Sequence, residues 1–104
     1  NKSISIESIQ NIVAAHYNLT INEMLSPSRS RSLARPRQIA MYLANQHTTK
    51  ALPEIGRKFS NRDHTTIIHS VKTIEKLKDK DPQMLENINK LKNQILYNNK
   101  DNEI

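Results

Sequence analysis

The sequence predicts an all-α fold of about six helices, and three observations support this prediction. Apolar residues recur at intervals of three or four over most of the chain, which is the spacing of one helical face. Pairs such as Asn-Gly, which mark tight β-hairpins, are absent. Ser, Thr or Asp precedes several of the periodic segments, as expected of residues that cap helices. With 104 residues the chain fits a single domain with one modest core. We place this core within residues 5–97 and a polar, frayed tail at residues 98–104.

The first two helices are predicted at residues 5–17 and 20–25. The first carries an apolar face at helical spacing, made of Ile6, Ile9, Ile12 and Val13. The second opens with Thr20-Ile21-Asn22-Glu23, which has the form of a capping box. Pro27 ends this short helix, and the polar, Arg-bearing residues 28–32 are predicted to form a loop.

The third helix is predicted to start at Leu33 or Pro36 and to end at Gln46, because Pro is tolerated only in the first turn of a helix. Its inner face consists of Ile39, Ala40, Leu43 and Ala44. Pro53 then suits the first position of a short fourth helix that runs through Phe59.

Residues 60–62 are predicted to form a tight connection to a long fifth helix. Asp63 caps this helix, which runs to about Asp79. Asp81 and Pro82 repeat the pattern of a cap followed by Pro, and open a sixth helix. The residues of this last helix that we expect to face inward are Met84 or Leu85, Ile88, Leu91 and Ile95.

The composition excludes several classes of function. Without Cys the chain has neither a disulfide framework nor a thiolate zinc site. A single Gly excludes both a Walker phosphate loop and a dinucleotide-binding fingerprint, which need several. Apolar runs stay shorter than the roughly 18 residues of a membrane span, and we expect a cytoplasmic protein without a secretory signal. The sequence begins at Asn1 rather than Met, which is consistent with a piece of a longer protein.

Metal and catalytic sites are not expected either. His64 and His69 fall on different sides of their predicted helix, so they do not face one metal ion. The sequence holds no HExxH or GxSxG pattern and no carboxylate pair with an obvious cleft. We therefore expect a binding module rather than an enzyme.

Positive charge is concentrated in the middle of the chain. The formal net charge is +6 and the sequence pI is about 9.8. Residues 28–78 hold eleven Lys and Arg against three acids, a net of +8, whereas the remainder is −2. A basic middle between acidic ends favours a polyanionic partner that binds there, and a merely solvated basic surface is the alternative.

The fourth and fifth helices have the pattern of a helix-turn-helix, whose second helix enters the DNA major groove by its N-terminal end. A helical wheel places Ile67, Ile68, Val71 and Ile74 toward the core. The opposite face consists of Thr65, Thr66, His69, Lys72 and Lys76. Such a face suits DNA, because Thr contacts bases through its methyl and hydroxyl groups and Lys holds the backbone. An ordinary solvated helix face is the alternative.

Three further features of the sequence leave alternatives open. Asp63 can simply cap its helix or also accept from a cytosine amino group, and the two roles compete for the same oxygens. The wheel places His64 on the core side, although a His at the first helical position can project past the helix end. The basic run contains Arg29, Arg31, Arg35 and Arg37, which suit either an A·T-rich minor groove or phosphates.

Three segments then carry a resemblance to a known family. RSRSLARPRQIAMYLA, LPEIGRKF and RDHTTIIHSVKTIEKL, in this order and spacing, resemble the C-terminal domain of the bacterial DnaA replication initiators over about residues 5–79. The resemblance implies a helix-turn-helix of the Trp-repressor type that binds double-stranded boxes of the form TTATNCACA at the replication origin. It implies that Arg29 enters the minor groove, while Asp63, His64 and Thr65 read the major groove with Thr66 beside them. Implied phosphate or supporting contacts fall on Arg31, Arg37, Gln38, Pro53, Arg62 and Ile67.

The sequence departs from the family pattern at three places. Ser60 and Asn61 stand where the family usually has two Gly, and we expect the turn to form because Asn tolerates left-handed geometry. Pro27 and Ser28 replace basic residues before the loop arginine, and Asn45 replaces a frequent Lys, which affects backbone binding.

The resemblance also sets expectations for partners. The ATPase module of the full-length family proteins is absent from this sequence, so we expect no ATP cofactor and no ATP hydrolysis here. We expect the remainder of an initiator protein as covalent neighbour and a monomer for the isolated domain.

Three other functions fit part of the pattern. A helix-turn-helix transcription regulator overlaps with the first interpretation, since the same family can act at promoters. An all-α adaptor for an acidic protein partner would need an exposed apolar stripe on the fifth helix, and none is predicted. RNA binding is disfavoured because the chain has one Phe and three Tyr but no aromatic stacking platform.

Overall fold

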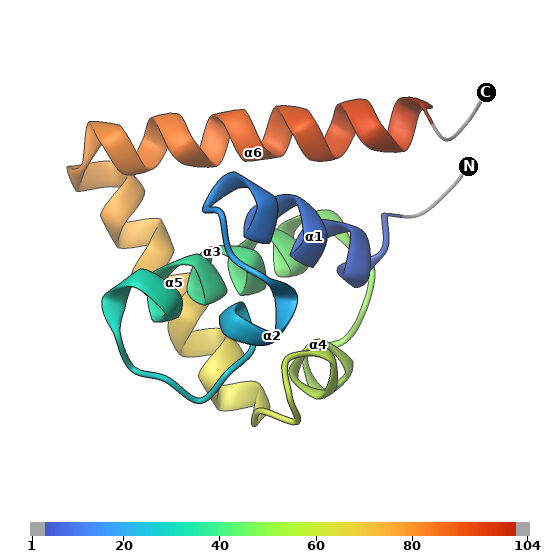
Figure 1. Ribbon diagram of the computed structural model, residues 1–104, viewed down its shortest axis with the longest axis vertical. Helices are drawn as coiled ribbons and strands as arrows, with labels where there is room; N and C mark the ends of the chain where they lie inside the picture. The colour runs from blue at the N-terminus through green and yellow to red at the C-terminus, as the bar shows by residue number, and fades with distance from the viewer. Residues whose placement is uncertain (1–3, 102–104) are drawn as a thin grey trace.

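The computed structural model describes residues 4–101, with side chains through Asn98, and it consists of six α-helices (Figure 1). These are α1 (Ile6–His16), α2 (Ile21–Met24), α3 (Arg31–His47), α4 (Leu52–Lys58), α5 (His64–Lys80) and α6 (Pro82–Asp101). Within the described residues there is no strand. The all-α prediction is therefore confirmed.

Capping side chains set the starts of the first two helices where the sequence predicts them. The Ser5 hydroxyl accepts from the Ser8 N–H at 3.0 Å. The capping box of α2 is complete, because the Thr20 hydroxyl accepts from the Glu23 N–H at 3.1 Å and the Glu23 carboxylate accepts from the Thr20 N–H at 2.9 Å. Both caps thus satisfy backbone N–H groups that helix geometry leaves without a partner.

The start of α3 corrects the prediction. The helix begins at Arg31, so Arg31 and Ser32 are helical rather than part of the loop, and Pro36 lies in the second turn. The Ser30 carbonyl accepts from the N–H groups of Leu33 and Ala34, which closes the first turn upstream of the proline. Pro36 removes one helical hydrogen bond, but it is buried, and the packing of this face outweighs the local penalty.

The connection between α4 and α5 is as tight as the sequence predicts. Ser60 and Asn61 both adopt left-handed backbone, with φ of 61° and 57°. Pro53 is the second helical residue of α4 rather than the first, because Leu52 precedes it in the helix. A Cβ on Gly56 would overlap the carbonyl oxygen of Arg62, so this glycine lets the turn fold back against α4.

One cluster of buried side chains joins the helices. α5 packs most extensively against α3 and also contacts α4 and α6. It contributes Ile67 and Ile74, which have no exposed surface. α6 covers α1 and contributes Ile88, Leu91 and Ile95.

For α6 one open alternative is resolved and one expectation needs correction. Of the two residues predicted to face inward, Met84 packs against the core, whereas Leu85 is 42% exposed. α6 continues to Asp101, so the tail predicted from residue 98 is helical up to that point, and residues 102–104 lie outside the described residues. A 20-residue helix with one apolar face gains its stability from packing along that face. The polar composition of the last residues therefore does not predict where the helix ends.

One side of the molecule is formed by loops and the first turns of helices. In Figure 1, α6 lies along one edge, while the loop between α2 and α3 and the first turn of α5 lie at the opposite edge. None of the helices in residues 4–101 is long and apolar enough to cross a membrane.

Candidate nucleic-acid interface

The first turn of α5 presents its side chains to solvent. Asp63, His64, Thr65 and Thr66 are all exposed, and burial begins at Ile67. The Asp63 side chain caps the helix by accepting from the Thr65 N–H at 3.1 Å. The predicted cap is therefore confirmed, and the four predicted base-reading residues of α5 are accessible together.

One oxygen of the Asp63 carboxylate makes both its hydrogen bond to the Thr65 backbone and its contact with His64. Oδ1 accepts from the Thr65 N–H and lies 3.0 Å from Nδ1 of His64, and neither contact involves Oδ2. The hydrogen bond from the Thr65 backbone is the main cause that lowers the pKa of Asp63, so the group is ionised near neutral pH. Capping therefore leaves an acceptor oxygen for a base amino group.

His64 does not lie over the core, which answers the alternative that the helical wheel left open. Its side chain is 53% exposed and turns toward Asp63. With Nδ1 directed at that carboxylate, Nε2 is the imidazole nitrogen left for an outside partner. The position at the helix start explains the difference, because a side chain there has no preceding turn to pack on.

The outer face of α5 agrees with the wheel. Thr65, Thr66, His69, Lys72 and Lys76 are all exposed, as predicted. Ile67 has no exposed surface, so its side chain supports the site by packing and cannot itself touch a ligand. Ile68 corrects the wheel, which places it toward the core. Its side chain is 36% exposed and lines a shallow groove with Leu52 and Val71, because it lies at the margin of the apolar face. One such residue does not form the stripe that an adaptor would need.

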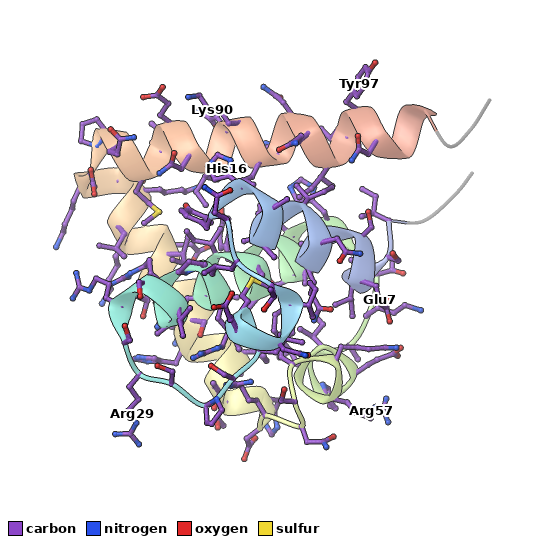
Figure 2. The ribbon with its side chains drawn as sticks, viewed as in Figure 1. Glu7, His16, Arg29, Arg57, Lys90 and Tyr97 are labelled. Carbon is purple, nitrogen blue, oxygen red and sulfur yellow. The ribbon has the colours of Figure 1, made fainter. Side chains whose placement is uncertain are left out.

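A second basic cluster surrounds the start of α3. Arg29, Arg31, Arg35 and Gln38 line a hollow on the surface. Figure 2 shows Arg29 extending away from the body of the protein. Arg35 is half-buried, and its Nη1 is enclosed without a hydrogen-bond partner in the protein. Burial and the nearby charge of Arg31 lower the pKa of Arg35, so an anion placed in this hollow would relieve an unfavourable concentration of positive charge.

Arg37 and Arg62 differ from the other predicted phosphate contacts. Arg37 is buried and donates to the carbonyls of Met24 and Ser28. Arg62 is half-buried and donates to three carbonyls, those of Leu25, Ser26 and Phe59. Both guanidinium groups are thus engaged inside the protein, which is consistent with a supporting role among the implied phosphate or supporting contacts.

A concave, largely apolar surface separates the two basic regions. It is lined by Leu25, Pro27, Ser60 and Arg62, between the α2–α3 loop and the turn before α5. The Ser60 hydroxyl donates to the Leu25 carbonyl at 3.0 Å across this surface. Pro53, also predicted as a contact, is exposed at the start of α4.

Sequence reasoning missed the structural roles of Ser60, Arg37 and Arg62. A signal existed for Arg37, since it shares a helical face with Ala40, Met41 and Ala44, all of them buried. No comparable signal marks Arg62 or Ser60, because their carbonyl partners at Leu25 and Ser26 lie more than thirty residues away. Among the described residues, no group of three His, Cys, Asp or Glu side chains converges in a way that could hold a metal ion.

Comparison with known proteins gives a consistent result. The family model described as bacterial dnaA protein helix-turn-helix matches residues 6–74. The chromosomal replication initiator protein DnaA of Roseobacter denitrificans is 50% identical over 91 residues, 88% of this chain and 20% of that protein. The protein of the same name from Ehrlichia ruminantium is 53% identical over 91 residues, with the same coverage. That from Gluconobacter oxydans is 46% identical over 95 residues, 91% of this chain and 20% of that protein. The chain therefore spans about a fifth of the length of these relatives.

Proposed function

The chain belongs to the bacterial DnaA family by its helix-turn-helix domain, and we propose that it binds double-stranded boxes of the TTATNCACA type at a replication origin. Binding of this kind would contribute to the initiation and regulation of chromosome replication. The rest of an initiator protein, as covalent neighbour, would supply the ATPase that this chain lacks.

One observation carries the proposal. The side chains of Asp63, His64, Thr65 and Thr66 are exposed together at the N-terminal end of a 17-residue helix that follows a tight turn. This is the part of a recognition helix that reaches base edges in the major groove. None of these side chains packs into the core, which supports a role in binding.

The chemistry of these residues suits base reading. The free oxygen of Asp63 would accept from a cytosine amino group, and the Thr methyl groups would contact thymine methyls. Arg29 would enter the adjacent minor groove, whose negative potential is strongest where it is narrow and A·T-rich. Arg31, Arg35 and Gln38 would hold a phosphate in the hollow at the start of α3, and Lys72 and Lys76 would hold the backbone further along α5.

We propose no catalytic role for this chain. A phosphate-binding loop needs several Gly and this sequence has one, so we expect neither ATP binding nor ATP turnover by the isolated domain. We also propose a monomer and a cytoplasmic location. Measurable ATP turnover by a contaminant-free preparation would overturn the proposal that the domain does not hydrolyse ATP. Sedimentation would test whether it is a monomer.

A fluorescence anisotropy titration tests DNA binding directly. A labelled duplex with a TTATNCACA box and a scrambled duplex of equal composition are titrated at two salt concentrations. We expect the box to bind at least about a thousandfold more tightly, which is the lower range for specific over nonspecific DNA binding. Equal affinity for the two duplexes would contradict the proposal.

A further inference from the structure

Two arginines, buried Arg37 and half-buried Arg62, hold one short segment of the chain, residues 24–28, through hydrogen bonds to its carbonyls. Arg37 comes from α3, and Arg62 comes from the turn before α5. Neither arginine forms an ion pair with a carboxylate, since none of the four ion pairs among the described side chains includes Arg37 or Arg62. All their hydrogen bonds go to backbone carbonyls instead.

Arg62 joins the segment to the helix-turn-helix. Its Nη2 donates to the Ser26 carbonyl at 2.8 Å, and its Nη1 donates to the carbonyls of Phe59 at 2.7 Å and Leu25 at 3.3 Å. Ser60 adds a bond from its hydroxyl to the Leu25 carbonyl. Arg62 directly precedes Asp63, so the group that caps α5 starts one residue from this anchor.

Arg37 joins the same segment to α3. Its Nε donates to the Met24 carbonyl at 2.8 Å, and its Nη2 donates to the Ser28 carbonyl at 2.9 Å. The Ser28 carbonyl belongs to the peptide unit immediately before Arg29. The loop residue expected in the minor groove is therefore held in place through its own backbone.

These bonds are stronger than ordinary surface contacts. Hydrogen bonds from a charged guanidinium are roughly twice as strong as neutral ones, and the fork of Arg fixes the relative position of its partners. Burial lowers the pKa of both Arg37 and Arg62, and the charge of Arg62 adds to the effect at Arg37. Two like charges are thus held close together because both bind the same segment.

We infer that Arg62 and Arg37 are positioning residues that fix the spacing between Arg29 and the first turn of α5, so that the two DNA-reading segments bind as one unit. The inference rests on the proposed DNA-binding function. The concave surface lined by Leu25, Pro27, Ser60 and Arg62 lies between the two segments. Arg62 then determines which groove spacing fits, rather than supplying affinity by contacting phosphate.

A double-mutant cycle tests this role, using the anisotropy titration on the box and the scrambled duplex. The variants are Arg29→Ala, Arg62→Met and the combination, because Met keeps much of the aliphatic stem and removes the donors. In the wild-type background we expect Arg29→Ala to weaken box binding by about tenfold or more. In the Arg62→Met background the same change should weaken it by less than about threefold, since the loop is no longer held in register with α5.

Three controls make the test specific. Arg62→Lys retains one donor group and should restore part of the coupling. Arg57→Met removes an exposed arginine of α4, in the same helix-turn-helix, and should leave the coupling unchanged. Circular dichroism melts give the folded fraction of every variant, so a loss of folded protein is corrected before affinities are compared. A purely structural role would weaken both duplexes equally and leave the coupling between residues 29 and 62 at zero.

The outcomes are distinguishable from a failure of the proposed function. If the wild-type chain does not prefer the box, DNA-box binding itself is wrong. If it prefers the box but Arg29→Ala has the same effect in both backgrounds, the positioning role is wrong. A salt dependence reduced by about one counterion in Arg62→Met would show that Arg62 contacts phosphate, which also overturns the inference.

Discussion

Asp63 shows how a single carboxylate serves folding and recognition together. Because capping occupies Oδ1, the substitution Asp63→Asn should keep the helix cap while replacing the free acceptor Oδ2 by an NH₂ donor. We expect the melting temperature to change little, since Asn caps helices about as well as Asp. Affinity for the box should fall by about tenfold or more, because a donor now meets the cytosine amino group. Melting curves and box titrations measure the two effects separately.

A paired loss of stability and affinity would mean that the carboxylate acts only as a cap. Asp63→Ala serves as the control, because it removes both roles and should lower the melting temperature as well as the affinity.

Substitutions of Thr65 and Lys72 distinguish contacts with bases from contacts with the phosphate backbone along the same helix. Thr65 lies in the exposed first turn, so Thr65→Ala should weaken specific binding by roughly 1–3 kcal/mol and leave the scrambled duplex almost unaffected. Lys72 lies two turns later, so Lys72→Ala should weaken both duplexes by similar factors and reduce the salt slope by about 1. The same titration at several salt concentrations measures both. Equal weakening of the two duplexes by Thr65→Ala would rule out base contact by this residue.

At this scale the sequence predicted residue chemistry better than residue partners. The outward face of α5 followed from helical spacing alone, because exposure on a packed helix depends on its angular position. The partners of Arg62 did not follow, since they are backbone carbonyls that only the tertiary fold brings near. His64 was ambiguous for a related reason, because a wheel describes helix interiors and not the residue at the end.

At the scale of elements, the approach of the turn to α4 depends on Gly56. Any side chain there would overlap the Arg62 carbonyl, which is backbone and cannot rotate away. We expect Gly56→Ala to lower the free energy of unfolding by on the order of 1–3 kcal/mol, and Gly56→Val by at least as much. Chemical denaturation measures the change. An unchanged midpoint for both variants would mean that the turn shifts without cost.

The left-handed turn offers a matched pair of substitutions at Asn61. An ordinary side chain in this conformation costs roughly 1–2 kcal/mol, whereas Asn is better tolerated and Gly adopts it freely. Asn61→Ala should therefore destabilise the domain by about 1 kcal/mol, and Asn61→Gly should change stability by less than about 0.5 kcal/mol. Both are read from denaturation midpoints. The reverse order would show that the side chain of Asn61, and not its backbone conformation, matters.

Helix starts were predicted well where a side chain caps them and poorly where packing decides. Thr20 and Asp63 mark their helices through hydrogen bonds that involve residues two or three positions away, so local sequence contains the information. The start of α3 depends instead on burial of Pro36 and on the bonds of Arg37 to residues 24–28. A rule for isolated helices excludes that proline, and only the surrounding fold makes it acceptable.

For the molecule as a whole, not every basic group is free to meet DNA. Of the eleven Lys and Arg in residues 28–78, Arg37 and Arg62 bind internal carbonyls and Lys58 pairs with Glu7 at 2.6 Å. If about six of the others contact phosphate, the slope of log K against log salt should be near −5. Titration of the box duplex over a range of salt concentrations gives this slope. A slope near zero would favour an acidic protein partner over DNA.

The tasks of α5 are divided along its length, and this has a consequence for how binding preference can change. Its first turn contributes nothing to the core, and burial starts only at Ile67. Positions 64–66 can therefore be replaced without loss of packing, provided that Asp63 remains as cap. Related domains could acquire new target sequences in small steps while keeping one scaffold, and a library randomised at these three positions would be a direct route to altered box preference.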